Sequence, residues 1–251
     1  MTQKLTILFD LDGTLVDTAP DLMGAHNHVM KKFGFHQKKL GDIKHLAGRG
    51  AWIMMQRSFK EDISDEKMKK EMVQEFIKHY AKNIDKGSKP IKGVVDFLKW
   101  AQSKKIPMAV CTNKQERLAV DLLKKIKLAE YFHYIAGCDT FDFNKPDPRH
   151  LTNVVEILGE DINKTIMVGD SEVDSQSAYN AKIPFILVEN GYTVDEPTIL
   201  ICSLAYAVVA TAIKDKLKII FLNIYVSRLV IFKETHYVFI TIKLQDLYCY
   251  S

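Results

Sequence analysis

The sequence is poor in cysteine and has no cysteine pairs of the kind that hold metals. Its 251 residues contain four cysteines, Cys111, Cys138, Cys202 and Cys249, and no two of them form a CxxC motif or a zinc-like spacing. The segment before Asp10 also lacks the apolar core and cleavage site of a secretory signal peptide. These absences favour reduced thiols in a cytoplasmic protein over a disulfide scaffold or a zinc site.

The sequence also lacks a large excess of basic over acidic residues. The chain has 35 basic and 31 acidic residues, a formal charge of +4, which is too small and too scattered to indicate nucleic acid or anionic lipid as a partner. With 47% hydrophobic residues, 12 glycines and 7 prolines, the composition excludes collagen-like, low-complexity and disordered classes. The length allows one large domain or two smaller ones.

Glycine is missing from the last fifth of the chain. Residues 197–251 contain 35 hydrophobic residues in 55 and no glycine, where average usage predicts roughly four. They also carry 6 basic and 3 acidic residues, which leaves 29 basic and 28 acidic residues in the first 196. The first four-fifths of the chain is therefore nearly neutral, and the tail has a different composition.

Three interpretations of this tail are open. Residues 197–213 form a 17-residue run without a charge, at the lower limit for a membrane span. The tail is a membrane-attached segment, an extra packed element, or a C-terminus replaced by out-of-frame translation. We favour the third, because the change in composition is abrupt. An intact upstream reading frame on resequencing would contradict it.

Short apolar runs alternate with helical patterns along the rest of the chain. The runs are residues 4–9, 107–111, 134–136, 165–168 and 184–188, and residues 92–104, 115–127 and 150–158 between them carry apolar side chains at helical spacing. This alternation predicts parallel βαβ units. We expect an α/β fold with a doubly wound, Rossmann-like parallel-sheet core.

One connection in this core is too long. About a hundred residues follow Asp10 before the next core strand, whereas a βαβ unit needs about 30. The excess has helical patterns at residues 21–33, 39–59 and 65–83, which predict an inserted α-helical cap. The expected domains are a core at 1–16 and 88–196, a cap at 17–87 and an atypical tail at 197–251.

Two pairs of acidic residues follow predicted strands. Asp10 and Asp12 stand two apart in DLDGT, so in an extended segment both project to the same side. A calcium loop of the EF-hand type is a rival interpretation. Such a loop needs a third oxygen ligand after the two aspartates and Glu at its twelfth position, but here Thr14 and Asp21 occupy these positions. Asp170 and Asp174 follow the run at 165–168, where they could simply cap a helix. Four carboxylates brought to one sheet edge need a cation, and such oxygen ligands suit Mg²⁺.

Other polar residues follow predicted strands or lie in turns. Thr112 ends the run at 107–111, where its hydroxyl would meet a ligand or merely cap the next helix. Lys145 lies in the turn NKPDP, where it is a candidate for the cation that those carboxylates need. Arg49, between Gly48 and Gly50 in the predicted cap, would meet a substrate carboxylate or phosphate, or be an ordinary exposed arginine.

Together these residues resemble the four ordered motifs of the haloacid-dehalogenase-like hydrolase superfamily. The match covers residues 5 to about 193: Asp10 and Asp12 fit the first motif, Thr112 the second, Lys145 the third, and Asp170 with Asp174 the fourth. The phrases DLDGTLVDTAPDL, TNK, NKPDP and VGDSEVD, with GYT downstream, are similar to phosphoglycolate phosphatases.

The resemblance implies a role for each of these residues. Asp10 would attack phosphorus and form an aspartyl-phosphate, and Asp12 would protonate the leaving oxygen and then activate water. Mg²⁺ would be held by Asp10, Asp170 and the main-chain carbonyl of Asp12, with Asp174 in support. Phosphoryl oxygens would be bound by Thr112, Asn113 and Lys145, and Arg49 matches a specificity loop in the cap.

The expected function is Mg²⁺-dependent hydrolysis of a small phosphorylated metabolite, 2-phosphoglycolate, to glycolate and phosphate. Within the superfamily, pyrophosphatase, nucleotidase and sugar-phosphate phosphomutase activities remain open. From another class, a non-catalytic membrane-associated binding protein remains open as well, although the filled motif positions argue against it.

Overall fold

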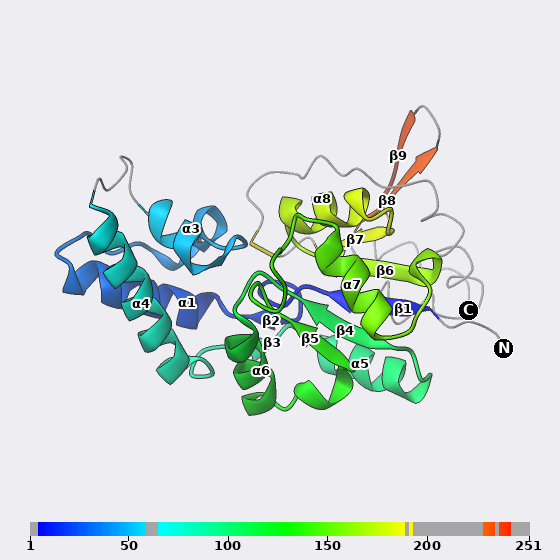
Figure 1. Ribbon diagram of the computed structural model, residues 1–251, viewed down its shortest axis with the longest axis horizontal. Helices are drawn as coiled ribbons and strands as arrows, with labels where there is room; N and C mark the ends of the chain where they lie inside the picture. Colours follow the sequence, from blue (N-terminus) through cyan, green and yellow to red (C-terminus); the bar gives the residue numbers. More distant parts are fainter. Residues whose placement is uncertain (1–4, 59–64, 189–190, 193–227, 234–235, 242–251) are drawn as a thin grey trace.

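The computed structural model describes residues 5–58, 65–188, 191–192, 228–233 and 236–241 (Figure 1). A five-stranded parallel sheet in the order β5-β4-β1-β6-β7 forms the core. Its strands are β1 (Thr6–Phe9), β4 (Met108–Cys111), β5 (Tyr134–Ala136), β6 (Thr165–Gly169) and β7 (Phe185–Leu187). Each apolar run that predicts a strand forms one, which confirms the expected α/β fold.

Helices cover both faces of this sheet because alternate residues of each strand point to opposite sides. Ile7 and Phe9 of β1 pack in one apolar cluster with residues of α5 and α6, whereas Leu8 packs in a second cluster with residues of α7 and α8. The bounds of these helices are α5 (Val94–Ser103), α6 (Glu116–Lys125), α7 (Arg149–Ile157) and α8 (Glu172–Asn180), and the short 3₁₀ turns η2 (Ala129–Tyr131) and η3 (Ile162–Lys164) lie between core elements. The sheet is therefore doubly wound, as predicted.

The long connection after β1 forms the inserted α-helical cap, which stands beside the core in Figure 1. It contains α1 (Ala19–Lys32), η1 (Leu40–Asp42), α2 (Ile43–Leu46), α3 (Gly50–Gln56) and α4 (Glu66–Asn83). Met72, Phe76 and Tyr80 recur every fourth residue on α4, so they share one face, and all three are buried. Gly48 and Gly50 have φ angles of 93° and 82°, which end the helical path between α2 and α3.

The two chain segments that enter and leave the cap are joined to each other. Strand β2 (Val16–Asp17) pairs antiparallel with β3 (Lys89–Pro90). The buried carboxylate of Asp21 accepts hydrogen bonds from the backbone of Gly87 and from the backbone and hydroxyl of Ser88, at 2.7–3.0 Å. Two-residue strands carry no periodic pattern, so the sequence did not predict this small sheet.

In the tail, the structure describes only β8 (Arg228–Lys233) and β9 (His236–Thr241), which pair antiparallel. The other residues of 197–251, including the uncharged run at 197–213, lie outside the described residues, so the three interpretations of the tail stay open. In the described ranges no helix combines the length and the hydropathy that a membrane crossing needs. The domain boundaries at 16/17, 87/88 and 196/197 stay predictions.

A buried histidine fastens α7 to the sheet. His150 is fully buried, and its Nε2 lies 3.1 Å from the carbonyl oxygen of Gly137, which can only accept a hydrogen bond. Nε2 therefore carries the proton of the neutral ring, and Nδ1 is buried with no hydrogen-bond partner in the part of the chain that the structure describes. Burial, with a smaller effect of Lys145, lowers the pKa of His150 from 6.5 to about 4.

We predict that His150 makes the fold sensitive to mild acid. Below pH 6.5 the unfolded chain binds a proton at this ring and the folded chain does not, so the free energy of unfolding falls as pH drops from 6.5 to about 4. The loss approaches about 3 kcal/mol. Urea unfolding at pH 7 and pH 5 measures it in wild type and in His150→Gln, which cannot titrate. An equal loss in both proteins would contradict the prediction.

Candidate active site

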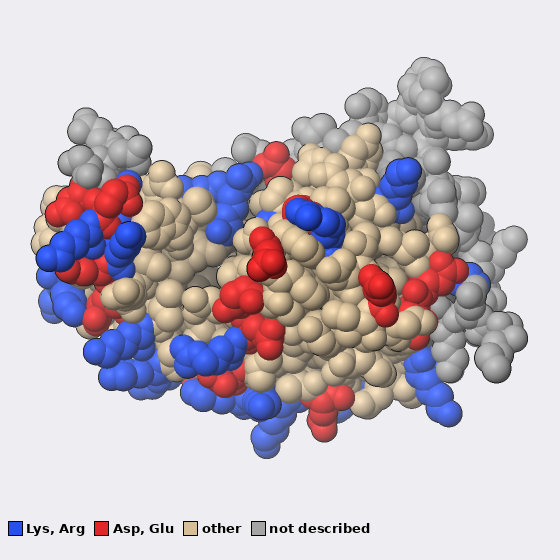
Figure 2. Space-filling model, viewed as in Figure 1, with Lys and Arg blue, Asp and Glu red and all other residues tan. Residues whose placement is uncertain are grey.

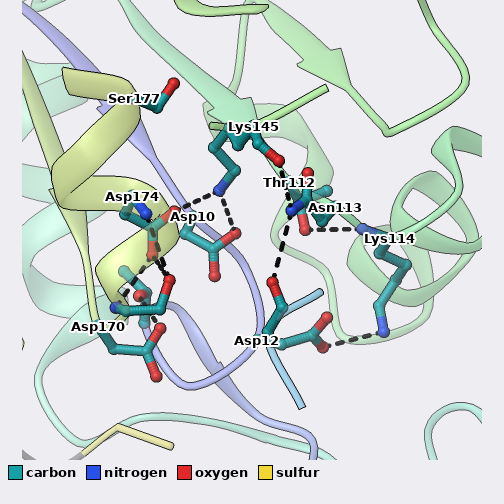
Figure 3. Close-up of polar contacts among 12 residues, drawn as sticks. Asp10, Asp12, Thr112, Asn113, Lys114, Lys145, Asp170, Asp174 and Ser177 are labelled. Atoms are coloured by element: carbon teal, nitrogen blue, oxygen red, sulfur yellow. Dashed lines mark hydrogen bonds and ion pairs between the residues drawn. The ribbon is translucent and has the colours of Figure 1, made fainter. Parts of the chain in front are cut away.

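The predicted catalytic residues gather at one edge of the sheet, where the parallel strands end (Figure 3). Asp10 follows β1 directly and Asp170 follows β6. Thr112 follows β4, Asp174 lies in the first turn of α8, and Lys145 comes from the loop between β5 and α7. Open α/β sheets bind ligands at this edge, because loops from several strands meet there.

Lys145 is the buried cation at the centre of this group. Its Nζ lies 2.7 Å from Oδ1 of Asp10 and 2.5 Å from Oδ1 of Asp174, and its side chain is 2% exposed. Burial by itself would lower the pKa of Lys145, but the two carboxylates outweigh it and raise the pKa, so the ammonium stays charged. The second oxygen of Asp174 accepts from the backbone and hydroxyl of Ser171, which caps α8.

Asp170 is buried without a cation partner in the described residues. Its oxygens accept from the backbone N–H of Tyr192 at 2.6 Å and from the Thr14 hydroxyl at 3.5 Å. Gly13 passes so close that a Cβ there would lie 2.4 Å from Oδ2 of Asp170, and its φ of 82° suits glycine alone. Burial, followed by repulsion from Asp10 and Asp174, raises the pKa of Asp170 well above its ordinary value.

Asp10, Asp170 and Asp174 could hold a metal ion. One oxygen atom from each lies within 4.8 Å of the others, and all three residues are buried. Burial also raises the pKa of Asp10 to about 7, because Lys145 only partly offsets it and Asp174 and Asp12 add repulsion. In the described residues the Lys145 ammonium pairs with Asp10 and Asp174, and no cation pairs with Asp170. This shortage of positive charge, with an all-oxygen donor set, fits a hard divalent cation.

Asp12 occupies a different environment two residues further along the loop. Its Oδ1 accepts from the Thr18 hydroxyl at 2.6 Å and lies 2.9 Å from Nζ of Lys114. The side chain is 16% exposed, at the cleft between cap and core. The two aspartates of the first motif therefore face one region but have separate partners, which suits separate roles.

Thr112 and Asn113 line the same region. Thr112 is 1% exposed, and its hydroxyl accepts from the backbone N–H of Lys114 at 3.2 Å. Asn113 donates to the main-chain oxygen of Lys145 at 3.0 Å, whereas its own Oδ1 is buried and has no hydrogen-bond partner among the described residues. The structure therefore brings both predicted residues beside Asp10, and their roles toward substrate stay predictions.

Arg49 lies at the edge of the cleft. Its side chain is 47% exposed, and Nη2 is 3.3 Å from Oε2 of Glu172, an exposed residue of α8. Glu172 belongs to the core and Arg49 to the cap, so this ion pair crosses the cleft between them. A contact of Arg49 with substrate stays a prediction.

The cleft itself has a volume of about 290 Å³ and is lined by both the cap and the core. Asp10, Asp12 and Thr112 contribute from the core, and Trp52 and Phe76 from the cap. Figure 2 shows the surface hollowed where these two parts meet, with acidic and basic side chains interspersed on the visible face. A small ligand reaching the aspartates is thus enclosed from two sides.

Sequence reasoning missed three residues that contact the aspartates. Lys114 and Thr18 bind Asp12, and Tyr192 binds Asp170 through its backbone while its hydroxyl contacts the backbone N–H groups of Thr18 and Ala19 at 2.6 and 2.7 Å. Lys114 belongs to the motif TNK and Tyr192 to the motif GYT. The sequence motifs therefore contained these two residues, but they did not indicate a contact with an aspartate for either one.

Comparison with known proteins identifies the family. The family model described as haloacid dehalogenase-like hydrolase matches residues 7–188, which include every motif residue at the sheet edge. The chain belongs to the haloacid dehalogenase-like hydrolase family. The resemblance inferred from the four motifs is confirmed, and with it the prediction that the protein is a hydrolytic enzyme.

Relatives within this family share most of their length with the chain. A phosphoglycolate phosphatase from Agrobacterium fabrum is 43% identical over 188 residues, 74% of this chain and 81% of the relative. One from Caulobacter vibrioides is 39% identical over 194 residues, 76% and 81% of the two chains. The crystal structure of a predicted phosphoglycolate phosphatase from Haemophilus somnus superimposes with a TM-score of 0.74, at 25% identity, covering 84% of this chain and 99% of that one.

Removing the Lys145 ammonium should lower the free energy of unfolding of this protein. In Lys145→Met, Asp10 and Asp174 lose their shared cation, and breaking a buried ion pair costs about 3–5 kcal/mol. Urea unfolding in a metal chelator measures this loss. The matched variant Lys125→Met, which removes an exposed pair with Asp85, should change stability by less than about 1 kcal/mol. Equal effects of the two variants would contradict the prediction.

Proposed function

We propose that the protein is a Mg²⁺-dependent phosphatase that hydrolyses a small phosphate monoester, 2-phosphoglycolate, through an aspartyl-phosphate intermediate. The observation that carries the proposal is the pair Asp10 and Asp12, two carboxylates on one loop with different partners. A single loop thereby supplies both a nucleophile and a group that transfers protons.

In the first step, a carboxylate oxygen of Asp10 attacks phosphorus, and the bond between phosphorus and the ester oxygen breaks. Lys145, 2.7 Å from Asp10, orients the nucleophile and offers positive charge to the phosphoryl oxygens. Thr112 and Asn113 stand beside Asp10 to bind the same oxygens. Asp12 donates a proton to the departing oxygen, so the product leaves as an alcohol.

In the second step, water hydrolyses the acyl phosphate on Asp10. Asp12, now deprotonated, takes a proton from the attacking water, and phosphate leaves with Asp10 restored. Thr18 and Lys114 both hold Oδ1 of Asp12, which leaves Oδ2 for substrate and water. The cap covers the cleft and limits the access of bulk water.

Mg²⁺ would be held by Asp10, Asp170 and the main-chain oxygen of Asp12, with Asp174 in support. When bound, it would supply the positive charge that offsets repulsion between a carboxylate nucleophile and an anionic phosphate. The raised pKa of the buried Asp170 carboxyl supports this assignment, because no cation in the described part of the chain forms an ion pair with that group.

The choice of 2-phosphoglycolate rests on relatives named phosphoglycolate phosphatase that are 37–43% identical to this chain. A cleft of about 290 Å³ suits a substrate of a few heavy atoms beyond the phosphate. The free thiols of Cys111 and Cys138 agree with the reducing cytoplasm as the place of action. A panel of small phosphate esters with a free-phosphate assay tests the choice and separates hydrolysis from mutase activity.

Replacing the nucleophile should abolish turnover and leave the fold intact. Asp10→Asn removes the attacking oxygen's charge, and we expect kcat with Mg²⁺ and 2-phosphoglycolate to fall by about 10⁴-fold or more. Asp96→Asn, an exposed change in the first turn of α5 that does not line the cleft, is the matched control and should keep wild-type kcat. Normal phosphate release by Asp10→Asn would rule out the covalent mechanism.

Metal binding can be measured without turnover. At 100 times its Kd, Mg²⁺ should raise the midpoint of thermal unfolding by about 5–10 °C, because it binds only the folded chain. Asp170→Asn removes one carboxylate of the cluster and should shrink this shift, whereas Asp96→Asn should not. If Mg²⁺ leaves the wild-type midpoint unchanged, the assignment of the metal fails.

A further inference from the structure

Lys114 places a buried ammonium beside Asp12 at the wall of the cleft. Its side chain is 5% exposed, and Nζ lies 2.9 Å from Oδ1 of Asp12 and 3.0 Å from the hydroxyl oxygen of Tyr80. Lys114 belongs to the core loop after β4, whereas Tyr80 belongs to α4 of the cap. Figure 3 shows Lys114 reaching toward Asp12 from the side opposite Lys145.

This pair of residues has hydrogen-bond donors to spare. An ammonium has three N–H groups, and among the described residues those of Lys114 have two partners, Asp12 and Tyr80. The Tyr80 oxygen accepts from Lys114, and its own proton has no recorded acceptor in the described part of the chain. Burial raises the pKa of Tyr80 to about 12, so that proton remains on the ring oxygen at neutral pH.

Apart from Arg49 at the mouth of the cleft, the other side chains of the cap wall are apolar. Trp52, Met54, Val73, Phe76 and Ile77 line the cleft on this side. Two hydrogen-bond donors within an apolar wall favour a ligand that places an acceptor beside them. If the ligand displaced water without providing an acceptor, the donors would be left unpaired, which costs free energy. An anionic acceptor binds most strongly, since the hydrogen bonds from an ammonium to a carboxylate are charge-assisted.

The position of the pair relative to Asp12 selects the part of the substrate it meets. In the proposed function Asp12 contacts the leaving oxygen, so Lys114, within hydrogen-bonding distance of Asp12, lies on the leaving-group side of the phosphorus. An acceptor on the carbon next to the ester oxygen would come within reach. Arg49 lies at the mouth of the cleft, half exposed and paired with Glu172.

We propose that Lys114 and Tyr80 form the specificity-determining contact of this enzyme and bind a carboxylate carried on the carbon next to the phosphate ester oxygen. This inference rests on the proposed function of Asp12 and adds which residues recognise the acidic end of the substrate. Because one partner comes from the core and the other from the cap, recognition requires the cap to be seated on the core.

The test compares two phosphate esters of nearly equal size, 2-phosphoglycolate and 2-hydroxyethyl phosphate, which lacks the carboxylate. The readout is the ratio of kcat/KM for the two, in which any shared loss through Asp12 cancels. We expect Lys114→Met to lower this ratio by about 100-fold and Tyr80→Phe by about tenfold, chiefly through KM for 2-phosphoglycolate. Lys114→Arg, which keeps the cation, should recover part of the ratio.

Two further variants make the comparison specific. Lys125→Met removes an exposed lysine that pairs with Asp85, and it should leave both esters and their ratio at wild-type values. Arg49→Met tests the other cation of the cleft. A fall of the ratio in Arg49→Met, without one in Lys114→Met, would assign carboxylate recognition to Arg49 and overturn the inference.

Other outcomes are equally decisive. An unchanged ratio in Lys114→Met and Tyr80→Phe, with both esters losing kcat alike, would show that the pair only positions Asp12. Thermal unfolding verifies that Tyr80→Phe is folded, since it removes a single oxygen. Failure of wild type to release phosphate from either ester would overturn the proposed function and this inference together. Normal turnover with an unchanged ratio overturns this inference alone.

Discussion

The crowding of buried carboxylates at the end of β1 and β6 is the constraint on which the site depends. One carboxylate oxygen each of Asp10, Asp170 and Asp174 lies within 4.8 Å of the others, and the ammonium of Lys145 pairs with Asp10 and Asp174 but not with Asp170. Such an arrangement is unfavourable by itself, because burial and mutual repulsion disfavour the charged form of the carboxyls. The pKa values of Asp10 and Asp170 are raised for this reason. Excess negative charge held at this sheet edge favours a cation there.

The cap depends on a second set of contacts, which meet at Asp12. Thr18, next to the start of α1, and Lys114, which contacts Tyr80 of α4, hold the same oxygen of Asp12. Asp21 joins the two segments that connect the cap to the core. The acidic group proposed to transfer protons is therefore positioned by both parts of the molecule, so cap placement and chemistry are linked.

Much of the core could be predicted because its signals are local. Each strand is a short apolar run, and alternation along β1 sends Ile7 and Phe9 to one face and Leu8 to the other. The separation of Asp10 and Asp12 by one residue, and of Asp170 and Asp174 by three residues, is readable from spacing. The pairing of β2 with β3 was not, because two-residue strands leave no period and their partners are about seventy residues apart.

The sequence by itself determined which residues are candidates for the active site and that they follow parallel strands, since strand period and motif spacing are properties of neighbouring residues. Only the tertiary structure decided which partner each one has. Lys145 is 135 residues from Asp10, and Lys114 joins Asp12 to Tyr80 across the cleft between core and cap. No local pattern encodes these contacts, because the buried charges choose partners from whatever the packed elements bring within about 3 Å.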